Sequence, residues 1–342
     1  MIGEPFPQMG TPALTTGDHG RSGPWPREVE KPGSGEAYRA TEGAVHAGSH
    51  LDGKWVAVLV LTSVRLLSVD TDEERDLRKL GTLLEKAQQR GEQTGADPNA
   101  SNVAARSPLA GDDAKTHPFE LSGYAWHALT VATDHLECLR TSVFGPPVNG
   151  CIEARIQTHA QSSLVRGAIE NGARAVWLLG PKDRPTRVTR RLALQRKEVR
   201  GSYRMRELVN QPATRTKEEA LTRVNDLLVA ALGITVDEAH QKLKQAPTYS
   251  LIVREAGDLA GIGADLAEVV WSGCSSLAHG DEYGTLGLLD KEVMARATVR
   301  GRDMAMTRVT GNISNLYWTT FAAMWMVEEG FRLYQARRTP YA

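Results

Sequence analysis

Three groups of side chains in this sequence have types and spacings that suit proton transfer or the binding of an anion. In the first group, His159, Ser163, Arg166 and Glu170 follow one another at intervals that place them on one face of a helix, and Arg174 continues that face. An imidazole, a guanidinium and a carboxylate on one face suit proton transfer or the binding of an anion. The alternative interpretation is an ion pair between Arg166 and Glu170 that fastens the helix in place.

The second group is a serine-rich helix end that closes with a histidine. Ser275 precedes His279 by four residues and Ser276 precedes it by three, so either hydroxyl can meet the imidazole. Gly280 is suited to a left-handed helix end. A histidine at this position can exchange protons near neutral pH. Alternatively, it caps the last carbonyl groups of the helix.

The third group is a basic segment from Lys182 to Arg206. It contains ten basic residues, against the two acidic residues Asp183 and Glu198. A helical stripe of this kind can hold phosphate groups, and the alternative is a solvated or acid-paired face. The candidate phosphate ligands are Arg190, Arg191, Lys197, Arg200 and Arg204.

Motifs for other chemistries are missing from the sequence. No phosphate loop, dinucleotide fingerprint or zinc-protease motif occurs, and Gly273–Leu277 does not have the spacing of a hydrolase nucleophile. His127, Asp134, His135 and His159 lack the spacing of metal ligands. We therefore expect neither a cofactor nor a metal.

The composition is that of an ordinary globular protein. The 342 residues include 41 basic and 41 acidic side chains, and 41% are hydrophobic, which excludes a wholly disordered or highly basic chain. Three scattered cysteines cannot form a disulfide framework. The sequence shows neither a signal peptide nor an apolar run of about 20 residues. We expect a cytoplasmic protein without a membrane anchor.

The N-terminal third has little pattern. Residues 1–50 hold nine glycines and six prolines, which predicts a flexible arm. Residues 51–117 form a small region and a linker, in which the apolar stretch 55–69 fits either a strand or a buried helix. Thr71 and Glu74 have the spacing of a capping box for a charged helix that ends near Gly91, and residues 91–117 read as linker.

Residues 118–342 predict an all-α domain, a helical bundle. The expected helices are 119–144, 149–179, 183–210, 214–232, a short one that ends before Pro247, 249–260 and 264–278, and residues 285–300 are a candidate hairpin. Thr235 and Glu238 have the spacing of a capping box for the short helix. The last helix carries one apolar seam at alternating intervals of four and three residues. The seam consists of Ile313, Tyr317, Thr320, Met324, Val327, Phe331 and Tyr334. Trp318, Phe321 and Trp325 widen this surface, part of which is a candidate dimer interface.

Two segments carry a family resemblance. SSLVRGAIENGARAVWLL and WSGCSSLAHG resemble a group of uncharacterised actinobacterial helical proteins, itself distantly similar to HEPN-type and abortive-infection-type domains. The resemblance covers about residues 123–336 and rests on Arg166 with Glu170 and on Ser275 with His279 and Gly280. It implies a helical bundle, often dimeric, in families that include RNA-cleaving toxins and defence factors.

HEPN ribonucleases carry an arginine followed four to six residues later by histidine, and this sequence departs from that pattern. Cleavage would require His279 to act on a ribose 2′-hydroxyl while Arg166 stabilises the phosphate charge. Our first hypothesis is therefore a HEPN-like protein that engages RNA or a nucleotide in stress or phage defence, with ribonuclease activity left open. The alternatives are a non-enzymatic interaction module, or a small-molecule enzyme with its pocket in the bundle core.

Overall fold

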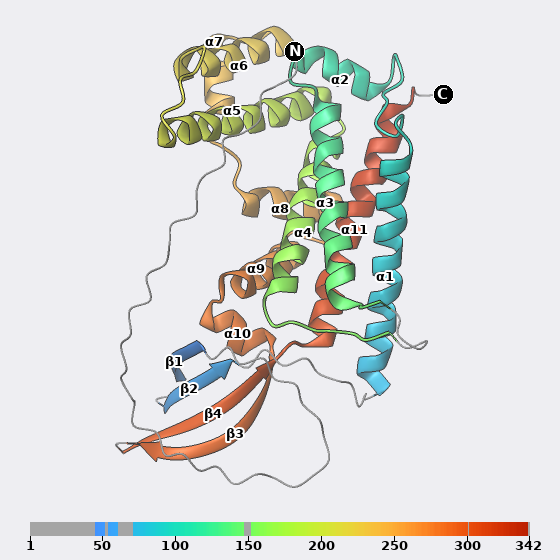
Figure 1. The fold of residues 1–342 in the computed structure, drawn as a ribbon. Coiled ribbons are helices and arrows are strands. Elements are labelled where there is room, and N and C mark those ends of the chain that lie inside the picture. The colour runs from blue at the N-terminus through green and yellow to red at the C-terminus, as the bar shows by residue number, and fades with distance from the viewer. Residues whose placement is uncertain (1–44, 52–53, 61–70, 147–151, 300, 341–342) are drawn as a thin grey trace. The chain divides into compact units, whose positions relative to one another are not determined.

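The helical core is built around one helix, α4 (Ala160–Leu179), which is largely buried. The computed structural model describes residues 45–51, 54–60, 71–146, 152–299 and 301–340. α4 packs against α3 (Leu121–Val143) and α11 (Ile313–Arg338), and α1 (Thr71–Ala96) contacts both of these neighbours. Figure 1 shows these helices side by side. The prediction of a mostly helical protein is confirmed.

Glycines allow α4 and α11 to approach closely. A Cβ atom on Gly172 would lie 3.1 Å from Cγ2 of Val327 on α11, and one on Gly330 would lie 3.3 Å from Cβ of Ala175 on α4 and 2.7 Å from Cδ2 of Leu129 on α3. Larger side chains here would push the helices apart, because a packed core has little room for added atoms. The central helices are therefore held at a spacing that only small residues permit.

The predicted seam of α11 is confirmed. All seven of its residues are buried, and most of them belong to the main hydrophobic core. The aromatic residues beside the seam behave differently, since Trp318 and Trp325 are about half exposed (58% and 48%). The helix therefore buries one side and leaves an aromatic edge at the surface.

The remaining helices form two groups beside this core. The first comprises α2 (Pro108–Thr116), α5 (Arg184–Leu208), α6 (Lys217–Leu232) and α7 (Val236–Leu243). It has its own small apolar core, which includes Val188, Leu192, Val224, Leu228 and Leu243. The second comprises α8 (Tyr249–Leu259), α9 (Ala264–His279) and α10 (Glu282–Leu288), of which α8 and α9 contact α4. Thr235 and Glu238 form the capping box predicted for α7.

Helix α2 corrects the prediction that residues 91–117 are a linker. Ser107 accepts a hydrogen bond from the backbone N–H of Ala110, and Pro108 occupies the first turn, where its missing N–H costs nothing. α1 also continues to Ala96, beyond the predicted end at Gly91. Because α1 and α2 contribute residues such as Leu84 and Leu109 to the main core, they pack with the bundle rather than apart from it.

The start of α4 also differs from the prediction of a helix over 149–179. Residues 147–151 lie outside the described part, and residues 152–159 that follow are not helical. There Ala154 pairs with Phe144 in an antiparallel bridge, and the N–H of Arg155 donates to the carbonyl of Val143 at 2.8 Å. Backbone pairing with the end of α3 thus replaces the predicted first turns.

A small sheet accompanies the predominantly helical fold. Its strand order is β1-β2-β4-β3, formed by β1 (Val45–Leu51), β2 (Lys54–Val60), β3 (Asp290–Val299) and β4 (Arg302–Thr310). β3 and β4 form the predicted hairpin, although it continues to Thr310. β2 settles the ambiguous stretch as a strand up to Val60, and β1 lies inside the predicted arm. Residues 1–44 and 61–70 lie outside the described part.

The described residues all belong to one unit, Arg39–Ala342. Within the described ranges, no helix combines the length and the apolar character needed to cross a membrane.

Candidate functional site

α4 presents polar side chains on the face that its core contacts leave open. Val165 and Ala168 are fully buried on one side of the helix, whereas Arg166 and Glu170 are partly exposed. α9 packs against this helix. The contact between the two helices brings together residues more than 100 positions apart in the chain.

The side chain of Arg166 contacts three others, those of Glu170, Trp271 and His279. Its Nε–H donates to Oε1 of Glu170 at 2.8 Å, and its Nη1 donates to Nε2 of His279 at 3.0 Å. The indole N–H of Trp271 donates to the same glutamate oxygen at 2.8 Å, and the guanidinium lies 5.9 Å from the centre of the indole. Arg166, Glu170 and His279 therefore meet as the sequence hypothesis requires. We call these four residues the Arg166 cluster.

The hydrogen bonds leave part of the guanidinium available. A guanidinium has five N–H donors and no acceptor, so Nε2 of His279 must receive the hydrogen bond on its lone pair. The proton of the neutral imidazole then resides on Nδ1. Glu170 and His279 together use only two of the five donors of Arg166. The remaining donors can meet an anion without breaking the bond to Glu170.

Exposure increases from the carboxylate to the imidazole. The side chain of Glu170 is 14% exposed and that of Arg166 is 26% exposed, while His279 is classed as exposed at the end of α9. Gly280 follows with a φ of 71°, the predicted left-handed helix end. The exposed end of the cluster is therefore at His279, and its more buried end is at Glu170.

Ser275 does not join the cluster. It is half-buried on α9, and among the described residues no hydrogen bond connects it to His279. The neighbouring Cys274 is buried, and burial raises the pKa of its thiol to about 12. A thiolate nucleophile at this position is thereby excluded near neutral pH.

His159 serves a different purpose from the one its spacing suggested. Its Nε2 lies 3.2 Å from the hydroxyl of Thr285, and that hydroxyl donates its own proton to the carbonyl of Asp281. The imidazole therefore donates from Nε2 and accepts at Nδ1 from Thr158, 2.8 Å away. Burial lowers the pKa of His159 below its usual value. This neutral histidine links the start of α4 to α10.

Three of the five basic residues predicted to bind phosphate have internal partners. Arg190 donates to Oε2 of Glu255 at 2.5 Å and lies 4.6 Å from the ring of Trp177. Arg191 is only 4% exposed, and burial lowers its pKa to about 10. Lys197 donates to the carbonyl of Pro247 at 3.2 Å. The basic stripe is therefore not a uniformly solvated surface.

The other two predicted ligands lie nearer the C-terminal end of α5. Arg200 is half-buried, and Arg204 is exposed with Glu207 3.9 Å away. The hydroxyl of Tyr203, the aromatic residue of this segment, donates to the carbonyl of Arg215 at 2.6 Å and lies 3.0 Å from that of Thr216. It ties α5 to the start of α6.

Three aromatic residues that contact arginines of α4 were not predicted from the sequence. Trp271 precedes Ser275 and His279 at intervals of four, a helical spacing that was available as a signal. Tyr124 and Tyr249 had no comparable signal, because they come from α3 and α8 and meet Arg174 only through packing.

The residues weighed as metal ligands do not converge. His127 and Asp134 are exposed on α3, and His135 lies against Gly167 of α4. Within the ranges that the structure describes, no three histidine, cysteine, aspartate or glutamate side chains gather as a metal site would require.

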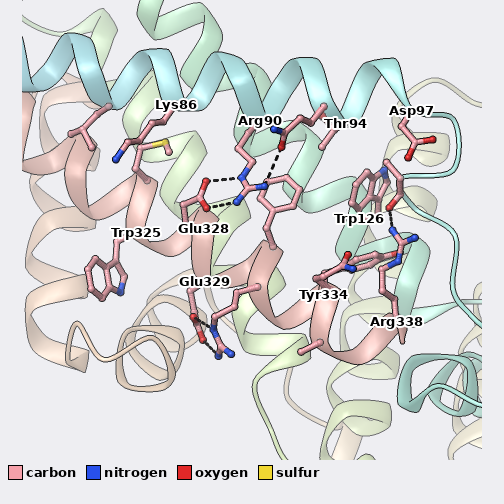
Figure 2. Close-up of a pocket in the computed structure, with 18 of the residues that line it drawn as sticks. Lys86, Arg90, Thr94, Asp97, Trp126, Trp325, Glu328, Glu329, Tyr334 and Arg338 are labelled. Carbon is pink, nitrogen blue, oxygen red and sulfur yellow. Dashed lines mark hydrogen bonds and ion pairs between the residues drawn. The ribbon is translucent and has the colours of Figure 1, made fainter. Parts of the chain in front are cut away.

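A separate groove of about 1250 Å³ lies between α1 and α11 (Figure 2). Trp126, Phe331 and Tyr334 contribute aromatic rings to its wall. Arg90 reaches across it to both carboxylate oxygens of Glu328, at 2.8 and 2.6 Å. No member of the Arg166 cluster lines this groove.

Comparison with known proteins gives no relative: no family model, no curated protein and no solved structure matches the chain.

Proposed function

We propose that the protein binds phosphate groups of RNA or of a nucleotide at the Arg166 cluster. The observation that carries this proposal is the meeting of Arg166 with Glu170 and His279 at a partly exposed position. A guanidinium with unused donors is suited to phosphate oxygens, because charge-assisted hydrogen bonds to phosphate are strong and directional.

Each member of the cluster has a role in this proposal. Arg166 donates to the phosphate oxygens, and His279 adds a donor from the solvent side once its imidazole turns. Glu170 and Trp271 act as positioning residues, because the indole fixes the carboxylate and the carboxylate fixes the guanidinium. A side chain held in this way loses little conformational entropy when it binds.

The same geometry favours binding over cleavage. A general base would abstract a proton with the Nε2 lone pair of His279, and that lone pair already accepts from Arg166. Ser275 supplies no nucleophile to the cluster. We therefore propose an RNA- or nucleotide-binding protein without assigning it a cleavage step.

Two further observations agree with the proposal. The motifs that meet in the cluster are those on which the resemblance to HEPN-type domains rests, which suggests a role in stress or phage defence. The described cysteines, Cys138 and Cys274, are both unpaired thiols, as is usual in the reducing cytoplasm.

The proposal is tested by RNA binding as a function of salt. The anisotropy of a fluorescent oligouridylate of about 12 nucleotides, a length within the range of single-strand sites, reports the affinity. We expect the affinity to fall steeply between about 50 and 200 mM salt. His279→Ala should weaken binding several-fold with an unchanged melting temperature, whereas His127→Ala, at an exposed position on α3, should not. Affinity that does not respond to salt would overturn the proposal.

A second candidate function, self-association, is favoured by the aromatic edge of α11. Trp318, Phe321 and Trp325 form a row in which neighbouring ring centres are 5.9 and 6.0 Å apart. Both tryptophans remain about half exposed, although the indole N–H of Trp325 donates to the carbonyl of Ala260. Tryptophan is enriched at the centres of interfaces, so we propose that a second copy of the chain covers this row.

Light scattering after size exclusion tests this second function. A dimer should form in the unmodified protein, and Trp318→Ser should convert it to a monomer while helix content is retained. A monomer at all concentrations would exclude self-association through α11.

A further inference from the structure

Beyond the Arg166 cluster, cations and tyrosine rings alternate in a row. Arg191 lies 4.3 Å and Arg174 5.9 Å from the ring centre of Tyr124. Arg174 also lies 5.6 Å from the ring centre of Tyr249, and Lys197 completes the row at 4.4 Å from the same ring. Four helices contribute: α3, α4, α5 and α8. We call these five residues the Tyr124–Tyr249 row.

The positive charges of this row are not paired with carboxylates. Arg174 donates to the hydroxyl of Tyr249 at 2.8 Å, Lys197 to a backbone carbonyl, and Arg191 to Gln195 and a backbone carbonyl. Among the described residues, none of the three cations forms an ion pair. Burial lowers the pKa of Lys197, and the nearby charge of Arg174 adds to the effect. Glu198 accepts a hydrogen bond from the hydroxyl of Tyr124 at 3.2 Å, and it and other nearby carboxylates offset part of this charge without bonding to the cations, which leaves a local positive potential.

One donor in the row is buried without a partner. Nη1 of Arg191 is inaccessible to solvent and makes no hydrogen bond. Buried polar atoms in folded proteins nearly always have a partner, and an orphaned charged donor is costly. Within the described ranges, the row therefore combines three cations that form no ion pair with one charged donor that forms no hydrogen bond.

The rings of the row point to a phosphate rather than a base. Each tyrosine ring already has two cations over it. A nucleobase would have to displace a cation in order to stack there, whereas a phosphate would meet the cations themselves. Contacts of this kind position a strand without reading its sequence.

We propose that the Tyr124–Tyr249 row is a second phosphate subsite, which holds the backbone of the RNA strand bound at the Arg166 cluster. The inference rests on the proposed function and sharpens it. Arg174 follows Arg166 by eight residues on α4, which corresponds to about 12 Å along a helix. Separate phosphates along one strand can occupy the two positions, so the ligand we infer is an oligoribonucleotide bound without sequence preference.

The slope of affinity against salt tests this subsite. For a single strand, each phosphate contact contributes about 0.7 to the slope of log affinity against log salt. Arg174→Gln and Lys197→Gln should each reduce the slope for the oligouridylate by about that amount, and Lys197→Arg should preserve it. Arg78→Gln, an exposed position on α1, is the matched control for the loss of one charge and should leave the slope unchanged. Melting temperatures establish that each variant is folded.

The outcomes separate this subsite from the proposed function. If RNA binds and neither substitution changes the slope, the subsite is wrong and the function stands. If RNA does not bind, inorganic pyrophosphate becomes the probe. A rise in melting temperature that Lys197→Gln abolishes would support an anion site without RNA binding, and no rise would overturn the subsite as well.

Discussion

Arg166 and Arg90 each pair with a glutamate, but the two pairs use the guanidinium differently. Arg90 of α1 meets both oxygens of Glu328 on α11, donates from Nη1 to Gln93, and lies 5.3 Å from the ring centre of Phe331. Arg166 meets one oxygen of a glutamate on its own helix. Its link to another helix is through His279 and the face of Trp271.

The different use of the guanidinium donors indicates a structural role for Arg90–Glu328 and a binding role for Arg166–Glu170. A two-pronged pair between helices holds them in register and leaves few donors for a ligand. The ion pair within one helix fixes the direction of the arginine, and only the single hydrogen bonds to His279 and Trp271 connect it to α9. We therefore infer that the Arg90–Glu328 pair stabilises the packing of α1 against α11, and that the Arg166–Glu170 pair orients an arginine that binds a ligand.

The largest effect we expect is that of Arg166→Gln on RNA binding. Loss of a charged hydrogen bond costs about 1.5–3 kcal/mol, so the affinity for oligouridylate should fall more than tenfold. The melting temperature should change by less than about 2 °C, because the ion pair with Glu170 lies within one helix. Anisotropy and thermal unfolding measure the two quantities. Unfolding of the variant with retained affinity in its folded fraction would reverse the assignment.

Arg90→Gln should show the opposite pattern. Loss of a half-exposed ion pair costs about 1 kcal/mol of folding free energy, which lowers the melting temperature by about 2–4 °C. The affinity for oligouridylate should stay within about twofold, since that groove contains no member of the Arg166 cluster. Chemical denaturation gives the free energy. A loss of RNA affinity equal to that of Arg166→Gln would remove the distinction between the pairs.

Trp271→Phe should have a smaller effect on binding. It removes the N–H that donates to Glu170 and keeps an aromatic ring beside Arg166. We expect the RNA affinity to fall about threefold, or about 0.6 kcal/mol, because the lost hydrogen bond to the Glu170 carboxylate affects binding only through the position of Arg166. Trp177→Phe is the matched control, because its indole donates to Glu255 on α8 at 2.7 Å. Equal effects of the two substitutions would show that stability, not positioning, is being measured.

The smallest effect should be the pH dependence contributed by His159. Its pKa in the folded protein is lowered from 6.5, so below that value the unfolded chain binds the proton first. The contribution of His159 to stability is present above pH 6.5 and is lost as the pH falls through the folded-state pKa. Urea unfolding between about pH 5 and pH 8 should show a shallower pH dependence in His159→Gln. His127→Gln is the control, and an unchanged profile for His159→Gln would contradict this account.

The helices could be read from the sequence wherever a local signal marked them. Gly280 and the capping box at Thr235 ended or began helices as predicted, and the seam of α11 identified buried residues individually. Ser107 and Pro108 are an equally local signal for the start of α2. This signal was overlooked because many small and polar residues surround it. β1 and the extended chain before α4 depend on pairing with distant backbone, which local patterns do not record.

In the candidate site, too, contacts within one helix could be predicted from the sequence and contacts between helices could not. The spacing of Arg166 and Glu170 predicted their contact, and the helix end at Gly280 predicted the position of His279. Whether the two helices bring these residues together is decided by packing over more than 100 residues of chain. The partners of Arg190 and Lys197 were hidden for the same reason, because Glu255 and Tyr249 come from α8.

The most direct test of the binding role of Arg166 is nitrogen NMR of the histidine rings during titration with oligouridylate. We expect the Nε2 resonance of His279 to move as RNA is added, because a phosphate competes for the guanidinium that donates to this nitrogen. The resonances of His159, bonded to Thr285 and Thr158, should stay in place. A His279 resonance that remains unchanged up to saturating RNA would contradict the central claim.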